Sequence, residues 1–148
     1  ISDYVRRGGR LGLICDLYDR TGIPVPFFGQ DAKTQAIGAM VARRSGGRMW
    51  MARCLRIGKS SRFQIEIKEL RVPRTNNLSD DVRVAMTEMQ KQFEAWVREA
   101  PAQWMWSNRR WRCGMDGMDL DGRYGHVRQV HLVVHASSIR PSGPPGPD

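Results

Sequence analysis

Acidic residues, cysteines and long hydrophobic runs are all scarce in this 148-residue chain. Its 15 acidic side chains stand against 24 lysines and arginines, which gives a formal net charge of +9. This balance favours anionic partners, such as nucleic acid, an acidic membrane face, phosphorylated ligands or an acidic carrier protein, without choosing among them. No signal-peptide pattern occurs, and no apolar run approaches the roughly 20 residues of a spanning helix. We therefore expect that this segment does not cross a membrane, although it can lie on one.

Motifs for metal, redox or cofactor chemistry are also lacking. The cysteines are odd in number, widely spaced and without a Cys-x-x-Cys pair: Cys15, Cys54 and Cys113. They predict reduced thiols in a cytosol-facing domain, with no disulfide frame and no zinc site. The spacing of the three histidines could suit a metal, but the run between them is Val-rich and disfavours that role: His126, His131 and His135. Because no Walker loop, dinucleotide fingerprint or nucleophile elbow occurs either, we expect no metal and no cofactor.

The first third of the chain indicates a strand, a stiff loop and a helix. Residues 11–15, LGLIC, are a short apolar run typical of a buried parallel strand, and Asp16 follows at its carboxyl end. Open α/β sheets place their sites at that end. Residues 22–29, GIPVPFFG, are too rich in proline for a central strand and predict a rigid aromatic loop. Helical spacing of apolar residues over 31–45, stopped by two glycines, predicts a helix.

The middle of the chain predicts a hairpin and a second helix. Residues 49–57 and 62–70 have the pattern of two strands joined by a short turn, and alternation in the second strand indicates one wet face. Ser79 is a good N-cap for a helix that continues to about Glu99, before Pro101. Strand, helix, hairpin and helix together predict an α/β fold, a layered sheet with flanking helices.

The last part of the sequence is harder to interpret. We expect residues 1–112 to form the domain and residues 113–148 to be a largely disordered tail, with a possible short strand over 127–135. The aspartates of residues 116–122 hint at a calcium loop, but the closing glutamate is missing, which favours an ordinary polar loop.

Residues 101–112, PAQWMWSNRRWR, combine indoles with guanidinium groups. The indoles surround three arginines, in the order Trp104, Trp106, Arg109, Arg110, Trp111 and Arg112. Guanidinium groups beside indoles suit phosphate binding, interfacial tryptophans anchor proteins at lipid headgroups, and aromatic rings can stack on nucleic-acid bases. The alternative is that the tryptophans cap the core and the arginines are solvated surface.

Read together, these stretches resemble the lauroyl/myristoyl-type lipid A biosynthesis acyltransferases. GGRLGLICDLYDRTGIPVPFFGQDAKT is similar to the family's glycine turn, strand, acid, VPFFG loop and helix start. FEAWVREAPAQWMWSNRRW is similar to its closing signature, and RFQIEIKEL fits the strand pair between them. The resemblance covers about residues 3–112 and implies an acyltransferase-like domain.

Departures from the family pattern affect what we expect of this chain. Leu17 stands where the family often has glutamine, and Asn108 where a histidine often precedes the arginine pair. The family's His-x-x-x-x-Asp/Glu motif and membrane anchor, which belong upstream, are not found, and the chain begins with Ile1. We therefore expect a C-terminal piece of such an enzyme, with no catalytic residue of its own and inactive alone.

The resemblance also implies a mechanism, partners and a location. In the intact enzyme a histidine oriented by a carboxylate takes a proton from a lipid A precursor hydroxyl, whose oxygen attacks the thioester of acyl carrier protein. The expected partners are acyl carrier protein, the lipid A precursor and an anionic membrane surface, at the cytoplasmic face of the bacterial inner membrane. We expect no nucleic acid, although a basic nucleic-acid-binding module that uses the Trp/Arg cluster is the alternative function.

The resemblance assigns substrate binding to two sets of residues. In this interpretation the phenylalanines form a wall of the site, Gly29 permits close approach, Asp16 holds a basic group or a loop near the site, and arginines contact phosphate. The expected substrate-binding residues are Asp16, Arg20, Phe27, Phe28, Gly29, Trp104, Trp106, Arg109 and Arg110.

Overall fold

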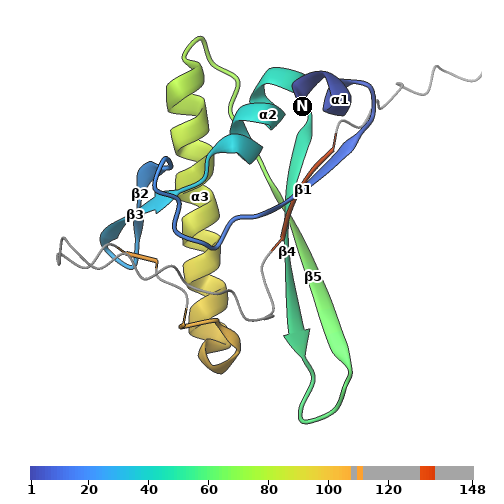
Figure 1. The fold of residues 1–148 in the computed structure, drawn as a ribbon, viewed down its shortest axis with the longest axis vertical. Helices are drawn as coiled ribbons and strands as arrows, with labels where there is room; N and C mark the ends of the chain where they lie inside the picture. The colour runs from blue at the N-terminus through green and yellow to red at the C-terminus, as the bar shows by residue number, and fades with distance from the viewer. Residues whose placement is uncertain (108–109, 112–130, 136–148) are drawn as a thin grey trace, which may run out of the picture.

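Helices and antiparallel strands alternate along the described part of the chain (Figure 1). The computed structural model describes residues 1–107, 110–111 and, for the backbone alone, 131–135. The elements are α1 (Ser2–Arg6), β1 (Arg10–Ile14), β2 (Ile23–Phe27), β3 (Gln30–Thr34), α2 (Ile37–Ser45), β4 (Arg48–Arg56), β5 (Phe63–Leu70), α3 (Leu78–Glu99), the 3-10 turn η1 (Pro101–Gln103) and β6 (His131–His135). This mixture is compatible with the predicted α/β class.

The larger sheet has four strands in the order β1-β6-β4-β5, and every neighbouring pair is antiparallel. The prediction that residues 11–15 form a parallel strand is therefore wrong. Leu11 and Leu13 are half-buried and alternate with three exposed residues, so only one face of β1 packs inward. A short apolar run indicates burial, but it carries no information about the direction of the strand beside it. Of the predicted strand over 127–135, residues 131–135 form β6, whereas the rest of the predicted tail lies outside the described residues.

The segment expected to be a loop and the first turns of a helix is instead a β-hairpin. Among the described strands, β2 and β3 form a separate two-stranded sheet, with Phe27 opposite Gln30. Pro24 and Pro26 occupy alternate, exposed positions of β2, which an edge strand tolerates because those residues need not donate to a ladder. The helix predicted from residue 31 begins only at Ile37, and its predicted end is confirmed by Gly46, which adopts the left-handed conformation at φ 77°.

The β4–β5 hairpin is confirmed, but β5 is largely exposed on both faces and not only on the polar face that the alternation indicated. Met49, Met51 and Arg53 of β4 are buried on the inner face. On β5, Ile65 and Ile67 are among the most exposed apolar side chains of the described residues, at 67% and 69%. Period-two alternation shows which residues share a face, but it does not show whether anything covers that face.

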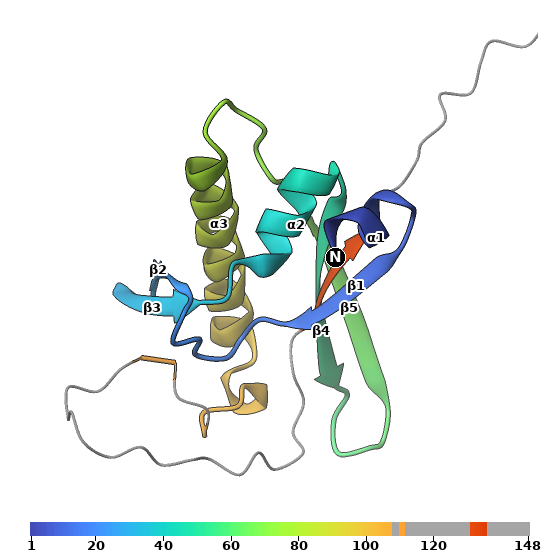
Figure 2. The same cartoon turned by 45° about the horizontal axis from the view of Figure 1, so that its top comes forward.

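Helix α3 packs against β2, α2 and β5. Figure 2 shows α2 and the β2–β3 hairpin beside it. Its buried stripe includes Met86, Met89 and Phe93, and full burial of such side chains contributes about 1.5–3 kcal/mol each. Its N-cap is Asn77 and not the predicted Ser79, because the Asn77 side chain accepts hydrogen bonds from two backbone N–H groups. The predicted end at Glu99 is confirmed.

Across the described residues, we find no helix with both the length and the apolar character that crossing a bilayer requires.

Candidate functional site

The two segments that carry the family resemblance meet at the hydroxyl group of Thr34. Arg110 donates from Nη2 to Thr34 Oγ1 at 2.8 Å, and Gln90 Nε2 of α3 donates to the same oxygen at 2.6 Å. The hydroxyl in turn donates to the carbonyl of Ala32 at 3.0 Å. One donated and two accepted bonds fill the capacity of a hydroxyl group, and Thr34 itself is fully buried. The hydroxyl therefore joins β3, α3 and the segment that follows η1.

The guanidinium group of Arg110 is itself enclosed by the protein. Its Nη1 donates to the carbonyls of Leu17 at 2.9 Å and Lys33 at 3.2 Å, and the side chain is only 4% exposed. Burial lowers the pKa of Arg110 to about 10, against the opposing effect of the negative charge of Asp16. The group thus stays cationic at neutral pH, and two of its N–H groups are directed at backbone oxygens.

Asp16 and Cys15 lie beside this arginine at the end of β1, and both are buried. Burial and, to a smaller extent, the charge of Asp16 raise the pKa of the Cys15 thiol to about 12, against the opposing effect of Arg110. A thiol of this kind is not a nucleophile near neutral pH. Asp16 interacts electrostatically with Arg110, and its predicted role in substrate binding stays a prediction.

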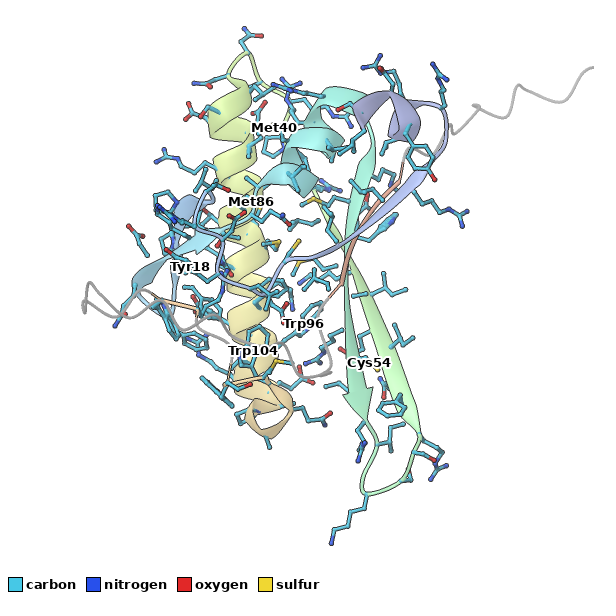
Figure 3. The ribbon with its side chains drawn as sticks, viewed as in Figure 1. Tyr18, Met40, Cys54, Met86, Trp96 and Trp104 are labelled. Carbon is cyan, nitrogen blue, oxygen red and sulfur yellow. The ribbon has the colours of Figure 1, made fainter. Side chains whose placement is uncertain are left out.

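Phe27 is the centre of an aromatic cluster. Its ring is stacked on Trp111 at 5.4 Å between centroids and lies tilted to Trp104 at 6.2 Å. The guanidinium carbon of Arg110 lies 5.3 Å from the centroid of the same ring. Figure 3 shows Trp104 beside the C-terminal part of α3, where it also meets Phe93. Because Phe27 is 1% exposed, its contacts are those of a packed core.

The β2–β3 turn presents the accessible edge of this cluster. Phe28 and Gly29 are the two turn residues, at φ 50° and φ 76°, and two consecutive positive φ angles are typical of a type I′ hairpin turn. A bulky side chain in the left-handed region costs about 1–2 kcal/mol. The Phe28 N–H donates to Glu94 Oε1 at 2.7 Å, which helps to hold this conformation.

Arg98 lies over the ring of Phe28, with its guanidinium carbon 4.7 Å from the ring centroid. Its Nη1 also donates to Glu94 Oε2 at 3.0 Å. The side chain of Arg98 is 61% exposed, so an anion in solution can reach it. The turn therefore offers an exposed cation supported by an aromatic ring and by a carboxylate.

The remaining predicted site residues are exposed or lie outside the described residues. Arg20 is exposed, and its carbonyl accepts a hydrogen bond from Lys33 Nζ at 3.2 Å. Trp106 is 60% exposed and donates from Nε1 to the Pro101 carbonyl at 2.8 Å. Arg109 lies outside the described residues.

Glu94 and Arg98 were not among the predicted site residues, although they stand four positions apart in the FEAWVRE segment that was used for the resemblance. The signal that could have found them is the i, i+4 spacing, which places both on one helix face. Thr34 and Gln90 had no comparable signal, because a buried hydroxyl and a buried amide are recognised only by their partners.

Comparison with known families identifies an acyltransferase domain. The matching family is bacterial lipid A biosynthesis acyltransferase, over residues 3–113, and the chain belongs to this family. The resemblance inferred from the motifs is thereby confirmed. No curated protein and no solved structure matches the chain.

Proposed function

We propose that this chain provides substrate-binding elements for transfer of a fatty acyl chain from acyl carrier protein to a lipid A precursor in lipopolysaccharide biosynthesis. The proposed location is the cytoplasmic face of the bacterial inner membrane. Family membership supports the acyl transfer and the lipid A pathway. The observation that carries the proposal is the position of Arg98 over Phe28, next to the buried cluster formed by the two family segments.

The proposed ligand has both apolar and anionic parts, and the β2–β3 turn offers a surface for each of them. Phe28 gives a half-exposed aromatic surface, and Arg98 gives a guanidinium group suited to phosphate oxygens. We assign the phosphate contact to Arg98 in preference to Arg110, because Arg110 already bonds two carbonyls and a hydroxyl. Arg110 then acts as a positioning residue that fixes the hairpin against α3.

In the proposed reaction, the oxygen of an acceptor hydroxyl forms an ester bond with the acyl carbon. The thioester C–S bond breaks, and the proton removed from the hydroxyl ends on the carrier thiol. In this 148-residue chain, no histidine is followed five residues later by an aspartate or glutamate. We therefore expect that the chain binds the acceptor but does not by itself transfer the acyl group.

The alternative, a nucleic-acid-binding module, requires the Trp/Arg cluster to be accessible for stacking and phosphate contact. Trp104 and Trp111 instead pack on Phe27, and Arg110 is buried. These contacts favour a structural role for this part of the cluster and weigh against the alternative.

The test is binding of a purified lipid A precursor in detergent micelles, followed by tryptophan fluorescence. We expect Arg98→Ala to weaken binding about tenfold, since it removes a charge-assisted contact. Arg83→Ala is the matched control, because Arg83 is an exposed arginine of the same helix with an acidic neighbour, Asp80, three residues earlier. Equal affinity of the two variants would refute the assignment of Arg98, provided that circular dichroism shows both to be folded.

A further inference from the structure

We propose that the β4–β5 hairpin docks onto an anionic lipid bilayer. The surface involved, which we term the hairpin face, combines exposed apolar residues with cations at the hairpin end: Arg56, Ile57, Lys59, Arg62, Phe63, Ile65 and Ile67. The inference deepens the proposed function, because it names the surface that would bring the domain to a membrane-embedded acceptor.

The hairpin face exposes four large apolar side chains. Phe63 and Ile57 are each 45% exposed, and Ile65 and Ile67 are 67% and 69% exposed. Phe63, Ile65 and Ile67 alternate along β5, so they lie on one side of the sheet. Contiguous exposed apolar surface of this kind is typical of an interaction site.

The sheet face that carries this apolar row extends from β5 across β4 and β6 to β1. Ile67 pairs with Ala52 of β4, and Ala52 pairs in turn with the β6 position that is opposite Ile14 of β1. Ile14 is 36% exposed. Helices α2 and α3 lie on the other side of the sheet, as the two views of the ribbon agree (Figures 1 and 2). Among the described residues, the apolar row of β5 therefore has no helix over it.

The charge of the hairpin end complements an anionic surface. Residues 54–65, CLRIGKSSRFQI, contain three cations and no acid. Arg56 lies over the ring of Phe63, 5.6 Å from its centroid, so cation and ring present one amphipathic surface. The nearest acids along the hairpin are engaged elsewhere, since Glu66 pairs with Arg53 and Glu69 pairs with Arg48.

Shape and charge together favour a bilayer over a second copy of the chain. The turn between β4 and β5 extends past α3 and η1 in both ribbon views, so a flat surface can reach it (Figures 1 and 2). The hairpin end of a second copy offers no acid to these cations, whereas an anionic bilayer offers headgroups to the cations and acyl chains to the isoleucines. Basic residues with exposed apolar neighbours are the combination that interfacial binding requires.

The experiment is flotation of the purified chain with phosphatidylcholine vesicles, with and without phosphatidylglycerol. No acyl donor or lipid A precursor is present, so the result is independent of the acyl-transfer proposal. We expect binding only to the anionic vesicles. Lys59→Glu with Arg62→Glu should lower the partition coefficient about 25-fold or more, since each basic residue near such a surface contributes about fivefold. Ile65→Gln with Ile67→Gln should lower it at least about tenfold.

Matched controls lie on α3. Val84→Gln replaces an apolar residue that is 49% exposed, and Arg83→Glu with Lys91→Glu reverses two exposed cations. The proposal is overturned if hairpin and control variants bind the vesicles equally well. It is also overturned if the isoleucine variant leaves lipid binding unchanged but abolishes a dimer in sedimentation velocity, because the face would then join two copies. Because the four hairpin side chains are exposed, urea unfolding should show the variants to be folded.

Discussion

Arg110 donates a hydrogen bond to the hydroxyl of Thr34, 76 residues earlier in the chain, at 2.8 Å. This bond lies inside the protein, where Thr34 is fully buried and Arg110 is nearly so. It joins the segment after η1 to the β2–β3 hairpin, and the bond from Gln90 to the same hydroxyl adds α3. The position of the Phe28 turn relative to Arg98 therefore depends on a polar contact in the core.

Loss of the Arg110 side chain should destabilise the fold strongly. We expect Arg110→Ala to lower the free energy of unfolding by about 3 kcal/mol or more, because buried carbonyls lose their donors and a cavity forms. Arg110→Lys should be intermediate, since an ammonium group cannot span three acceptors with the planar geometry of a guanidinium group. Urea unfolding followed by tryptophan fluorescence measures both. Arg44→Ala, at an exposed position, should stay within about 0.5 kcal/mol of the parent.

The positive φ angle of Phe28 predicts an unusual order of two substitutions. Both Phe28→Ala and Phe28→Gly remove the ring, but only glycine adopts φ 50° without strain. We therefore expect the glycine variant to be more stable than the alanine variant by about 1 kcal/mol in urea unfolding. At Phe63, on strand β5, the order should be reversed, because glycine weakens a strand. An alanine variant at position 28 that equals or exceeds the glycine variant would contradict the turn conformation.

Gly22 should tolerate no side chain. A Cβ atom placed there would lie 2.4 Å from the carbonyl oxygen of Thr34 and 2.8 Å from its backbone nitrogen, and a strand backbone cannot simply move aside. We expect Gly22→Ala to lower the free energy of unfolding by about 2 kcal/mol or more. Gly12→Ala is the control, because a Cβ atom at Gly12 of β1 meets nothing within 4 Å. Equal midpoints of urea unfolding for the two variants would show that the approach of Gly22 to β3 is not this close.

Asp81 should make the stability of the protein sensitive to acid. Burial tends to raise its pKa, but hydrogen bonds from Arg43 and Thr75 outweigh this effect and hold the pKa below the ordinary value of 3.8. A depressed folded-state pKa contributes stability above the unfolded pKa, and that contribution is lost as the pH falls through the folded value. Unfolding free energies of the parent and of Asp81→Asn should therefore differ most near neutral pH and converge below about pH 4.

Asp80→Asn provides the comparison for this pH series. Asp80 is 59% exposed, next to Asp81 in the first turn of α3. Its substitution removes one carboxylate from the same helix end and so controls for the change in net charge. A constant gap between the parent and Asp81→Asn from neutral pH to pH 3 would contradict the assignment of the acid sensitivity to Asp81.

Local pattern predicted several elements well. The spacing of apolar residues in the 79–99 region gives α3, and alternation gives the β4–β5 pair, because both signals arise from a repeat within one segment. The predicted N-cap of α3 was nevertheless wrong, because the residue that caps the helix is Asn77 and not Ser79. The β2–β3 hairpin was not predicted, because Phe-Gly is an uncommon sequence for a type I′ turn and its strained residue is held by Glu94 from a distant helix.

Residue identity and order were enough to predict the family, the motifs that meet in the fold and the basic character of the chain, because all three are properties of the chain before it folds. The folded arrangement was needed to establish strand direction, the burial of Arg110, the pairing of Arg98 with Phe28 and the exposure of the β5 isoleucines. The reason is that each of these depends on which segment lies opposite. Whether a guanidinium group contacts a ligand or is buried in the core depends on residues that lie tens of positions away along the chain. Whether an isoleucine is buried or exposed depends on such residues too.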